Sequence, residues 1–240
     1  MKKKSLKFIG VISMLFLLSG CDLPLQEEFD FKPEVDILAP FENITAWEWI
    51  QTRSSTTTQA PYLGSEFDYF KAAIIKADMV EEYNQIATKE RTYLLLNNNA
   101  FLGAGNVINI ITGSAAAIPA GETAEQTMAR VDTPAELDKL KAVLRYHIVT
   151  TYILQVPTLF TRDLDYVFQT LIPGNDGLIA FRRTTDGLVQ WTIKVNSPTT
   201  APSPLPKTAT DEWENVINHN YQFKNGVGHV IGDPVRNKPY

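Results

Sequence analysis

The spacing of hydrophobic residues divides the chain into a helical part and a strand part. From about residue 41 to 160, apolar residues recur at helical spacing, as Trp47 and Ile50 do in the segment from Thr45 to Arg53. From about residue 165 onward, apolar and polar residues alternate in the manner that is typical of strands. Helices followed by hairpins predict a single domain of the α+β class.

Two helix starts are predicted from capping residues. Ser65 and Asp68 fit a capping box, in which each side chain satisfies a free amide of the first turn. A second start combines Thr133 as the cap with Pro134 at the first helical position and Glu136 at the third. Behind the first start, one apolar face is formed by Phe67, Phe70, Ile74 and Ala77.

Three regions are predicted to form strands. The apolar run Thr92–Leu96 lies between two helical blocks and is suited to a buried strand. Residues 178–185 and 188–195 are expected to pair as a hairpin through the turn Asp186-Gly187. A last strand, Gly226–Ile231, follows an Asn-Gly turn.

Two segments are predicted to be surface loops. Residues 103–123 are rich in glycine, alanine and small polar residues. Residues 197–210 hold four prolines among serine, threonine and alanine, which indicates an extended loop. The cluster from Gly174 to Gly177 is typical of a turn.

The first twenty residues have the parts of a secretory signal. Four lysines precede a short apolar stretch from Phe8 to Leu18, and small residues follow it. The apolar stretch is too short to span a bilayer as a helix, which needs about 20 residues. The ending Leu18-Ser19-Gly20-Cys21 resembles the lipobox of bacterial lipoproteins, in which the cysteine is lipidated and becomes the new N-terminus. The alternative is an ordinary signal peptide with a cysteine there by chance.

The predicted organisation has three parts: a signal peptide at 1–20, a lipidated Cys21 with a tether to residue 40, and a domain at 41–240. Several acyl chains would anchor the protein stably in the membrane, where one chain binds only marginally. The acids of the tether fit either a sorting label for the cell surface or a solvated spacer, while Asp22 also fits retention in the inner membrane. We expect the protein to be located in the bacterial cell envelope, and the outer membrane is the favoured membrane.

Charge and composition exclude some partners. The chain has 44% hydrophobic and 20% charged residues, as an ordinary globular protein does, and Cys21 is its only cysteine, so no intrachain disulfide can form. Its formal net charge is −5. Cleavage before Cys21 would remove four lysines and no acid, leaving 18 basic and 27 acidic residues and a net charge of −9. Such a chain repels phosphate backbones, so nucleic acid is not expected as a partner.

No sequence motif for catalysis is found. The chain lacks His-Glu-x-x-His and Gly-x-Ser-x-Gly, and its three histidines (His147, His219 and His229) are too scattered to predict a metal site. We therefore expect no metal, no cofactor and no enzymatic activity. A pair of carboxylates brought together by the fold, as in glycosidases, stays an open alternative.

Three segments together resemble the fasciclin-like domain family. In the first, residues 92–101, the matches are Thr92, Asn98, Ala100 and Phe101, while Leu96 stands where the family usually has proline. The second is the Tyr-His pair within residues 144–149, which follows a helix. The third is residues 225–231, similar to the family's closing Asn-Gly-x-x-His-x-Ile box, with Gly232 in place of the usual aspartate.

This resemblance covers roughly residues 41–236 and implies a wedge or sandwich of two β-sheets flanked by helices from the N-terminal half. It also implies a surface-attached adhesion protein that contacts protein or glycan without enzymatic activity. For Tyr146 and His147 it implies a part in partner binding. His147 also continues the apolar stripe of Leu140 and Leu144, which favours a hydrogen-bonded core residue. A structural role is favoured for His229, and exposure for His219.

The tryptophans are candidates for a sugar-binding surface, because aromatic faces stack on apolar ligand surfaces. Trp191 alternates with Ile193 and is expected in the core, while the exposure of Trp49 is undecided. Trp213, beside the proline-rich loop, is the best candidate for an exposed ring. The function expected is a membrane-anchored adhesion or binding module for protein or polysaccharide. The alternatives are an accessory subunit of an outer-membrane glycan-capture complex and a carboxylate-dependent polysaccharide hydrolase.

Overall fold

Seven strands join into one mixed sheet in the computed structural model, which describes residues 41–55, 62–102, 106–113, 121–186, 190–197, 204–205, 209 and 213–235. The strands are β1 (Thr92–Leu96), β2 (Ile148–Val149), β3 (Asp165–Gln169), β4 (Leu178–Asp186), β5 (Gln190–Val195), β6 (Glu214–Phe223) and β7 (Gly226–Ile231). Their order across the sheet is β2-β1-β7-β6-β5-β4-β3. β1 and β7 are parallel, and the other neighbours pair antiparallel.

The two edges of this sheet meet at one point. An isolated bridge joins Val149 in β2 to Thr170, the residue that directly follows β3. The Leu171 N–H donates to the Ile148 carbonyl at 2.9 Å, and the Thr150 N–H donates to the Gln169 carbonyl at 2.9 Å. The sheet therefore nearly closes on itself. Since the chain also forms several helices, the predicted α+β class is confirmed.

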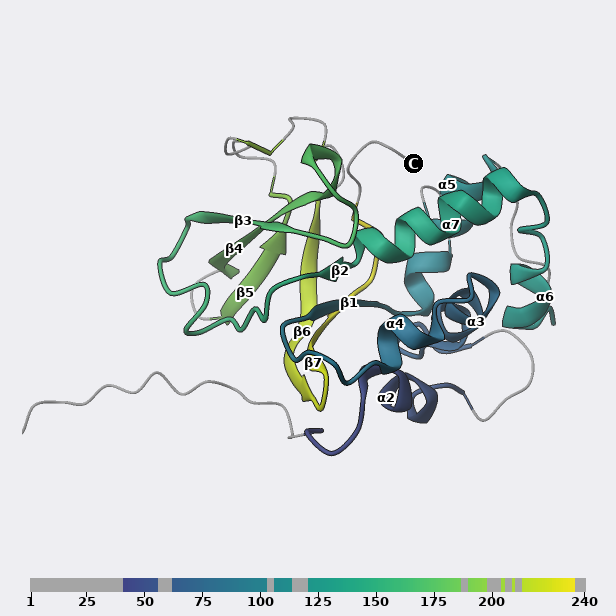
Figure 1. Ribbon diagram of the computed structural model, residues 1–240, viewed down its shortest axis with the longest axis horizontal. Coiled ribbons are helices and arrows are strands. Elements are labelled where there is room, and N and C mark those ends of the chain that lie inside the picture. The colour runs from purple at the N-terminus through teal and green to yellow at the C-terminus, as the bar shows by residue number, and fades with distance from the viewer. Residues whose placement is uncertain are drawn as a thin grey trace, which may run out of the picture. The chain divides into compact units, whose positions relative to one another are not determined.

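The helices gather beside β1 and β2 (Figure 1). They are α2 (Ala46–Thr52), α3 (Asp68–Lys76), α4 (Val80–Asn84), α5 (Val107–Thr112), α6 (Ala124–Met128) and α7 (Pro134–Tyr146), with 3₁₀ turns at Asn98–Phe101 and Asn175–Gly177. Every residue of β1 and of β7 is buried. The strands predicted at Thr92–Leu96 and Gly226–Ile231 are thus confirmed, and they lie side by side in the core.

The helix start predicted at Thr133 is confirmed. Thr133 is the N-cap of α7, Pro134 is in its first turn, and Glu136 completes the capping box. The stripe of α7 that carries Leu140 and Leu144 is buried. Local chemistry alone therefore located this helix.

The capping box predicted for Ser65 and Asp68 is wrong. α3 begins at Asp68, and its N-cap residue Phe67 makes no side-chain cap. The missing acceptor comes from Asn98, whose side-chain oxygen accepts the Tyr69 N–H at 3.2 Å and whose amide donates to Asp68 at 3.0 Å. A residue about thirty positions away thus caps this helix. The predicted apolar face of α3 is nevertheless buried.

The loop predicted over residues 103–123 is also wrong in part. α5 begins after Asn106, whose side chain accepts the Asn109 N–H, and it ends at Gly113 in the left-handed conformation. Its residues Val107, Ile108 and Ile111 are buried. A short helix therefore adds apolar surface to the core within the segment that was expected to be an insertion.

The C-terminal half differs from expectation in two details. Leu205 and Ala209, within the predicted surface loop 197–210, are buried against Ala180. β4 and β5 pair as the hairpin predicted, with Asp186 opposite Gln190. The turn residue Gly187 and the side chain of Trp191 lie outside the described part of the structure.

Residues 1–40, which hold the predicted signal, Cys21 and tether, lie outside the described residues. In the described ranges, the structure has no helix long and apolar enough to cross a membrane.

Candidate binding site

The two residues of the Tyr-His pair both lie in the core. Tyr146 is the last residue of α7, His147 is its C-cap, and each has 0% exposed surface. The Tyr146 hydroxyl donates to the Leu178 carbonyl at 2.8 Å and accepts from the Asn196 side-chain amide at 3.0 Å. Tyr146 therefore ties the helix to the far strands of the sheet, and a partner does not reach it in this conformation.

The His147 ring is held by two backbone groups. Nδ1 lies 2.7 Å from the Val143 carbonyl, to which it must donate, and Nε2 accepts from the Val235 N–H at 3.1 Å. Burial lowers the pKa of His147 to about 4, partly opposed by the Val143 carbonyl. This is the core role favoured by its place on the helix stripe.

In His229, which lies in β7, the two ring nitrogens have the opposite donor and acceptor roles from those in His147. Its Nε2 donates to the Ile153 carbonyl at 2.8 Å, and its Nδ1 accepts from the Asn220 N–H at 3.2 Å. Burial lowers its pKa to about 3. His219, which was expected to be exposed, is instead half-buried.

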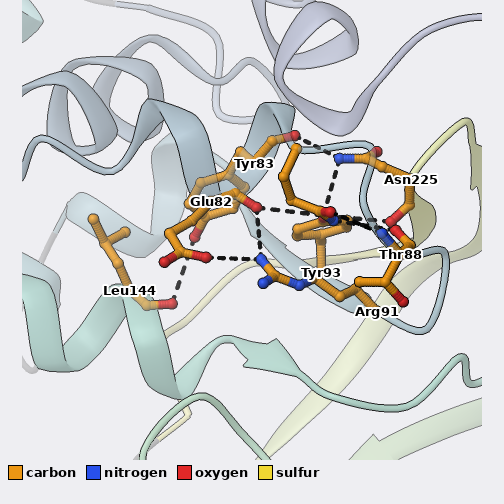
Figure 2. Close-up of polar contacts among 8 residues, drawn as sticks. Glu82, Tyr83, Thr88, Arg91, Tyr93, Leu144 and Asn225 are labelled. Carbon is orange, nitrogen blue, oxygen red and sulfur yellow. Dashed lines mark hydrogen bonds and ion pairs between the residues drawn. The ribbon is translucent and has the colours of Figure 1, made fainter.

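The Asn-Gly pair at the start of β7 has a structural role. Asn225 is buried, and its amide donates to the Tyr83 carbonyl at 2.8 Å and to the Tyr93 hydroxyl at 3.0 Å (Figure 2). Its side-chain oxygen accepts the Ala46 N–H at 2.9 Å. Gly226 follows at φ +152°, where a Cβ would lie 2.4 Å from the Arg91 carbonyl. This network joins α2, α4, β1 and β7, and its Asn225 atoms are fully used.

Trp213 is exposed, as expected. Its side chain is 40% exposed, and the Lys194 ammonium lies 4.9 Å from the ring centroid. This single ring beside a lysine could take part in binding, but the structure places it apart from the residues that line the groove described next.

Trp49, whose exposure the sequence left undecided, is only 2% exposed. It packs in an aromatic cluster with ring centroids 5.0 Å from Tyr221, 5.3 Å from Phe67 and 5.6 Å from Phe223. The Arg53 guanidinium lies 5.3 Å from the centroid of the Trp49 ring. Three of these aromatic residues, Trp49, Phe67 and Tyr221, border a groove, and Tyr221 is the one whose ring is only half-buried.

The groove lies where α2, the start of α3 and the end of β1 meet β6 and β7. Its volume is about 190 Å³. The residues that line it are Trp49, Arg53, Ser65, Phe67, Asn97, Ile217, Asn218, Tyr221 and Val230.

An irregular stretch of β6 shapes one wall of this groove. The pairing of β6 with β7 shifts by one residue on each side of Asn218, and Asn220 has a positive φ of 63°. In a regular strand, neighbouring side chains point to opposite faces, and a bulge changes this direction. Ile217 and Asn218 are consecutive, yet both are exposed and both line the groove.

Several polar groups of the groove have no partner among the described residues. The Trp49 Nε1 is buried and unpaired. A buried donor without an acceptor costs about 1–3 kcal/mol, and such groups often mark functional places. The structure also shows no hydrogen bond for the side chains of Ser65, Asn218 and Tyr221 within the described ranges. The side chains of Ser65, Asn218 and Tyr221, which are exposed or half-buried, therefore offer hydrogen-bonding capacity to a ligand, whereas the Trp49 Nε1 is too deeply buried for a ligand to reach.

Burial raises the pKa of Tyr221, and the charge of Arg53 opposes that rise. The phenol therefore stays protonated at neutral pH and can both donate and accept. The Asn97 side-chain oxygen accepts the Asn99 N–H at 3.0 Å. This bond fixes the orientation of the side-chain amide and therefore the position of its nitrogen.

A second cavity, of about 350 Å³, lies beside α3. Two carboxylates line it, Asp68 and Glu125, together with Lys71. Both oxygens of Asp68 already accept hydrogen bonds, from the Ser55 N–H at 2.8 Å and from Asn98. Asp68 therefore holds the fold together at this point. In the described ranges no group of His, Cys, Asp or Glu side chains is placed to hold a metal ion.

Sequence reasoning did not find most of the groove. Its residues come from five separated segments. Arg53 and Asn218 belong to no recognisable motif, and Asn97 lies within the first fasciclin-like segment but is not one of its matching positions. The one sequence feature that pointed toward the groove is that Trp49 lies off the apolar face formed by Trp47 and Ile50.

Comparison with known proteins finds similarity among solved structures alone. No family model matches the chain, and no curated protein matches it. Among solved structures it is similar to a FAS1 domain pair from the insect cell adhesion molecule Fasciclin I, at 18% sequence identity and a TM-score of 0.43. The match covers 74% of this chain and 46% of that chain, so this chain spans less than half the length of the structure it matches.

Proposed function

We propose that the chain is a non-enzymatic binding module with a divergent fasciclin-like fold, held in the bacterial cell envelope by lipid on Cys21. Its ligand is a polysaccharide or a protein, bound in the groove between α2 and β6. The observation that carries this proposal is that the half-buried Tyr221 ring lies in the groove together with the side chains of Ser65 and Asn218, and that none of the three makes a side-chain hydrogen bond among the described residues.

The groove suits one unit of a polymer. Sites for whole drug-sized ligands have volumes of roughly 300–1,000 Å³, and this groove has about 190 Å³. Aromatic rings take the apolar face of a ligand, while amides and hydroxyls fix its orientation. A sugar ring presents both kinds of surface at this size, so polysaccharide is favoured over protein.

A hydrolase needs two carboxylates at the reacting bond. Among the described residues that line the groove, none is acidic. The second cavity has Asp68 and Glu125, but the hydrogen bonds of Asp68 hold it in a structural role. Binding without cleavage is therefore the better-supported function. A place as accessory subunit in an outer-membrane glycan-capture complex is compatible with it.

The test uses the mature chain with Cys21→Ser, so that the protein stays soluble, on an array of polysaccharides and envelope proteins. Both retention and release of products are recorded. We expect retention without products, lost in the double variant Ile217→Ala with Asn218→Ala, because both side chains are exposed on the groove wall.

The matched control is Trp213→Ala, which removes an exposed ring outside the groove. Unchanged binding in this variant supports the groove. Binding lost with Trp213 but kept in the double variant would place the site at Trp213 instead. Product release abolished by Asp68→Asn or Glu125→Gln would make the protein a hydrolase.

A further inference from the structure

We infer that the groove recognises an acidic polysaccharide, and that Arg53 binds the carboxylate of one uronic acid unit. This inference rests on the proposed function and names the ligand class of the same site.

Charge in the groove is the first argument. Arg53 is the charged residue among the described lining side chains, and no described acid lines the groove beside it. An arginine without an acid beside it attracts an anionic group at short range. The net charge of −5 acts on the whole polymer and opposes its approach, so the attraction must come from Arg53 within the groove.

The second argument is that Arg53 has no partner within the described structure. Arg91 pairs with Glu82 at 2.8 Å and Arg130 pairs with Glu122 at 2.6 Å. Arg162 and Arg182 are likewise each paired with an aspartate. Arg53 is exposed, no described residue forms an ion pair with its guanidinium, and the guanidinium lies 5.3 Å from the centroid of the Trp49 ring.

That contact prepares Arg53 for a carboxylate. Cation–π attraction to the indole ring restrains the position of the Arg53 guanidinium, and this contact uses none of its N–H donors. These N–H groups form a fork that matches the two oxygens of a carboxylate. An exposed ion pair is normally weakened because ordering its side chains costs conformational entropy. For Arg53, part of this ordering is already present before the ligand binds.

The neighbouring groups favour a sugar over an acidic peptide side chain. Ser65, Asn218 and Tyr221 each carry an acceptor oxygen as well as donor hydrogens, without a partner among the described residues. An aspartate or glutamate side chain only accepts, so it would leave these acceptors unused. Sugar hydroxyls both donate and accept, and a sugar's C–H face can pack on the half-buried ring of Tyr221.

The experiment measures binding of the mature Cys21→Ser chain to polygalacturonate, alginate and hyaluronan, and to the same polymers after reduction of their carboxyl groups to alcohols. We expect at least one native polymer to bind, and its reduced form to bind roughly 10- to 100-fold more weakly, the range for a lost charge-assisted hydrogen bond. Arg53→Gln should give the same loss, and Arg53→Lys a smaller one, because lysine keeps the charge without the fork.

Arg145→Gln is the matched control. Arg145 is exposed near the end of α7, away from the groove, and its replacement should leave binding unchanged. Thermal unfolding of each variant verifies that it is folded. Equal binding of native and reduced polymers would overturn the acidic ligand and leave the proposed function standing. Binding of poly-glutamate with none of the polysaccharides would make the ligand an acidic protein segment. Failure to bind any polymer or peptide would remove the groove as the site altogether.

Discussion

At the scale of single residues, two buried histidines are held as opposite neutral tautomers. His147 carries its hydrogen on Nδ1, and His229 carries its hydrogen on Nε2, as their backbone partners require. In each ring the other nitrogen accepts a backbone N–H. If this second nitrogen were protonated, its new N–H would face the backbone N–H that it now accepts. Protonation therefore breaks one hydrogen bond and places a positive charge in the core.

We expect this arrangement to make stability depend on pH. The pKa values in the folded state are about 4 for His147 and about 3 for His229, below the value of about 6.5 in the unfolded chain. The unfolded chain therefore binds more protons between these values, and stability falls as the pH drops below about 6.5. Each histidine should contribute about 1.4 kcal/mol per pH unit until its folded pKa is reached. Urea unfolding at a series of pH values measures this slope, and His147→Gln should reduce it by one proton. A slope that stays the same in this variant would contradict the assignment.

Removal of the His147 side chain should affect stability and leave binding alone. His147→Ala removes two hydrogen bonds and creates a cavity in the core, with an expected loss of about 2–4 kcal/mol in the free energy of unfolding. The folded variant should bind the ligand of the groove as the wild type does. Weaker binding by a fully folded variant would restore the partner-binding role that the family resemblance implies for Tyr146 and His147.

The sequence predicted the place of His147 because the residue continues a stripe of leucines on one helix. It could not predict the groove in the same way. Arg53 and Asn97 are adjacent there only because the sheet and helices bring distant segments together. Asn218 faces the groove because the strand is irregular. Periodicity reports the face of a regular element, and here the element is not regular.

At the scale of the element, α7 owes its start to a capping box that can be tested alone. The Thr133 hydroxyl accepts the Glu136 N–H at 3.2 Å, and the Glu136 carboxylate accepts the Thr133 N–H at 3.0 Å, which lowers the pKa of Glu136. Thr133→Ala should lower the free energy of unfolding by about 1 kcal/mol, measured by urea unfolding. Thr133→Ser keeps the hydroxyl and should retain most of the stability. Equal losses in both variants would mean that the methyl group, not the cap, stabilises the helix.

The contrast between α7 and α3 shows the limit of local rules. α7 is capped by a residue next to it, so four letters of sequence predict its start. α3 is capped by Asn98 from a 3₁₀ turn beyond β1, and no local pattern contains that contact. α5 had both of its signals, Asn106 before it and Gly113 after it, but the glycine- and alanine-rich segment around it indicated a loop. Its burial is a tertiary effect.

At the scale of the whole molecule, the fold class followed from the order of helices and strands. The near-closure of the sheet did not, because it depends on a bridge between β2 and the end of β3 that has no sequence signature.

The anchoring of the whole molecule is a prediction about Cys21. Mass spectrometry of the mature protein from membranes should find an N-terminal Cys21 with a diacylglycerol on sulfur and an acyl group on nitrogen. Cys21→Ser should release the protein into the soluble fraction, since one residue carries the whole attachment. An unmodified Cys21, or cleavage at another position, would end the prediction.

The position of β7 has a consequence for synthesis. The last strand of the chain pairs in parallel with β1, whose residues precede it by about 130 positions, and it sits between β1 and β6. Until residues 226–231 have left the ribosome, the strand that joins β1 to β6 is missing, although the other described strands have already been made. The two halves of the sheet cannot join before then, because β1 has no neighbour on that side.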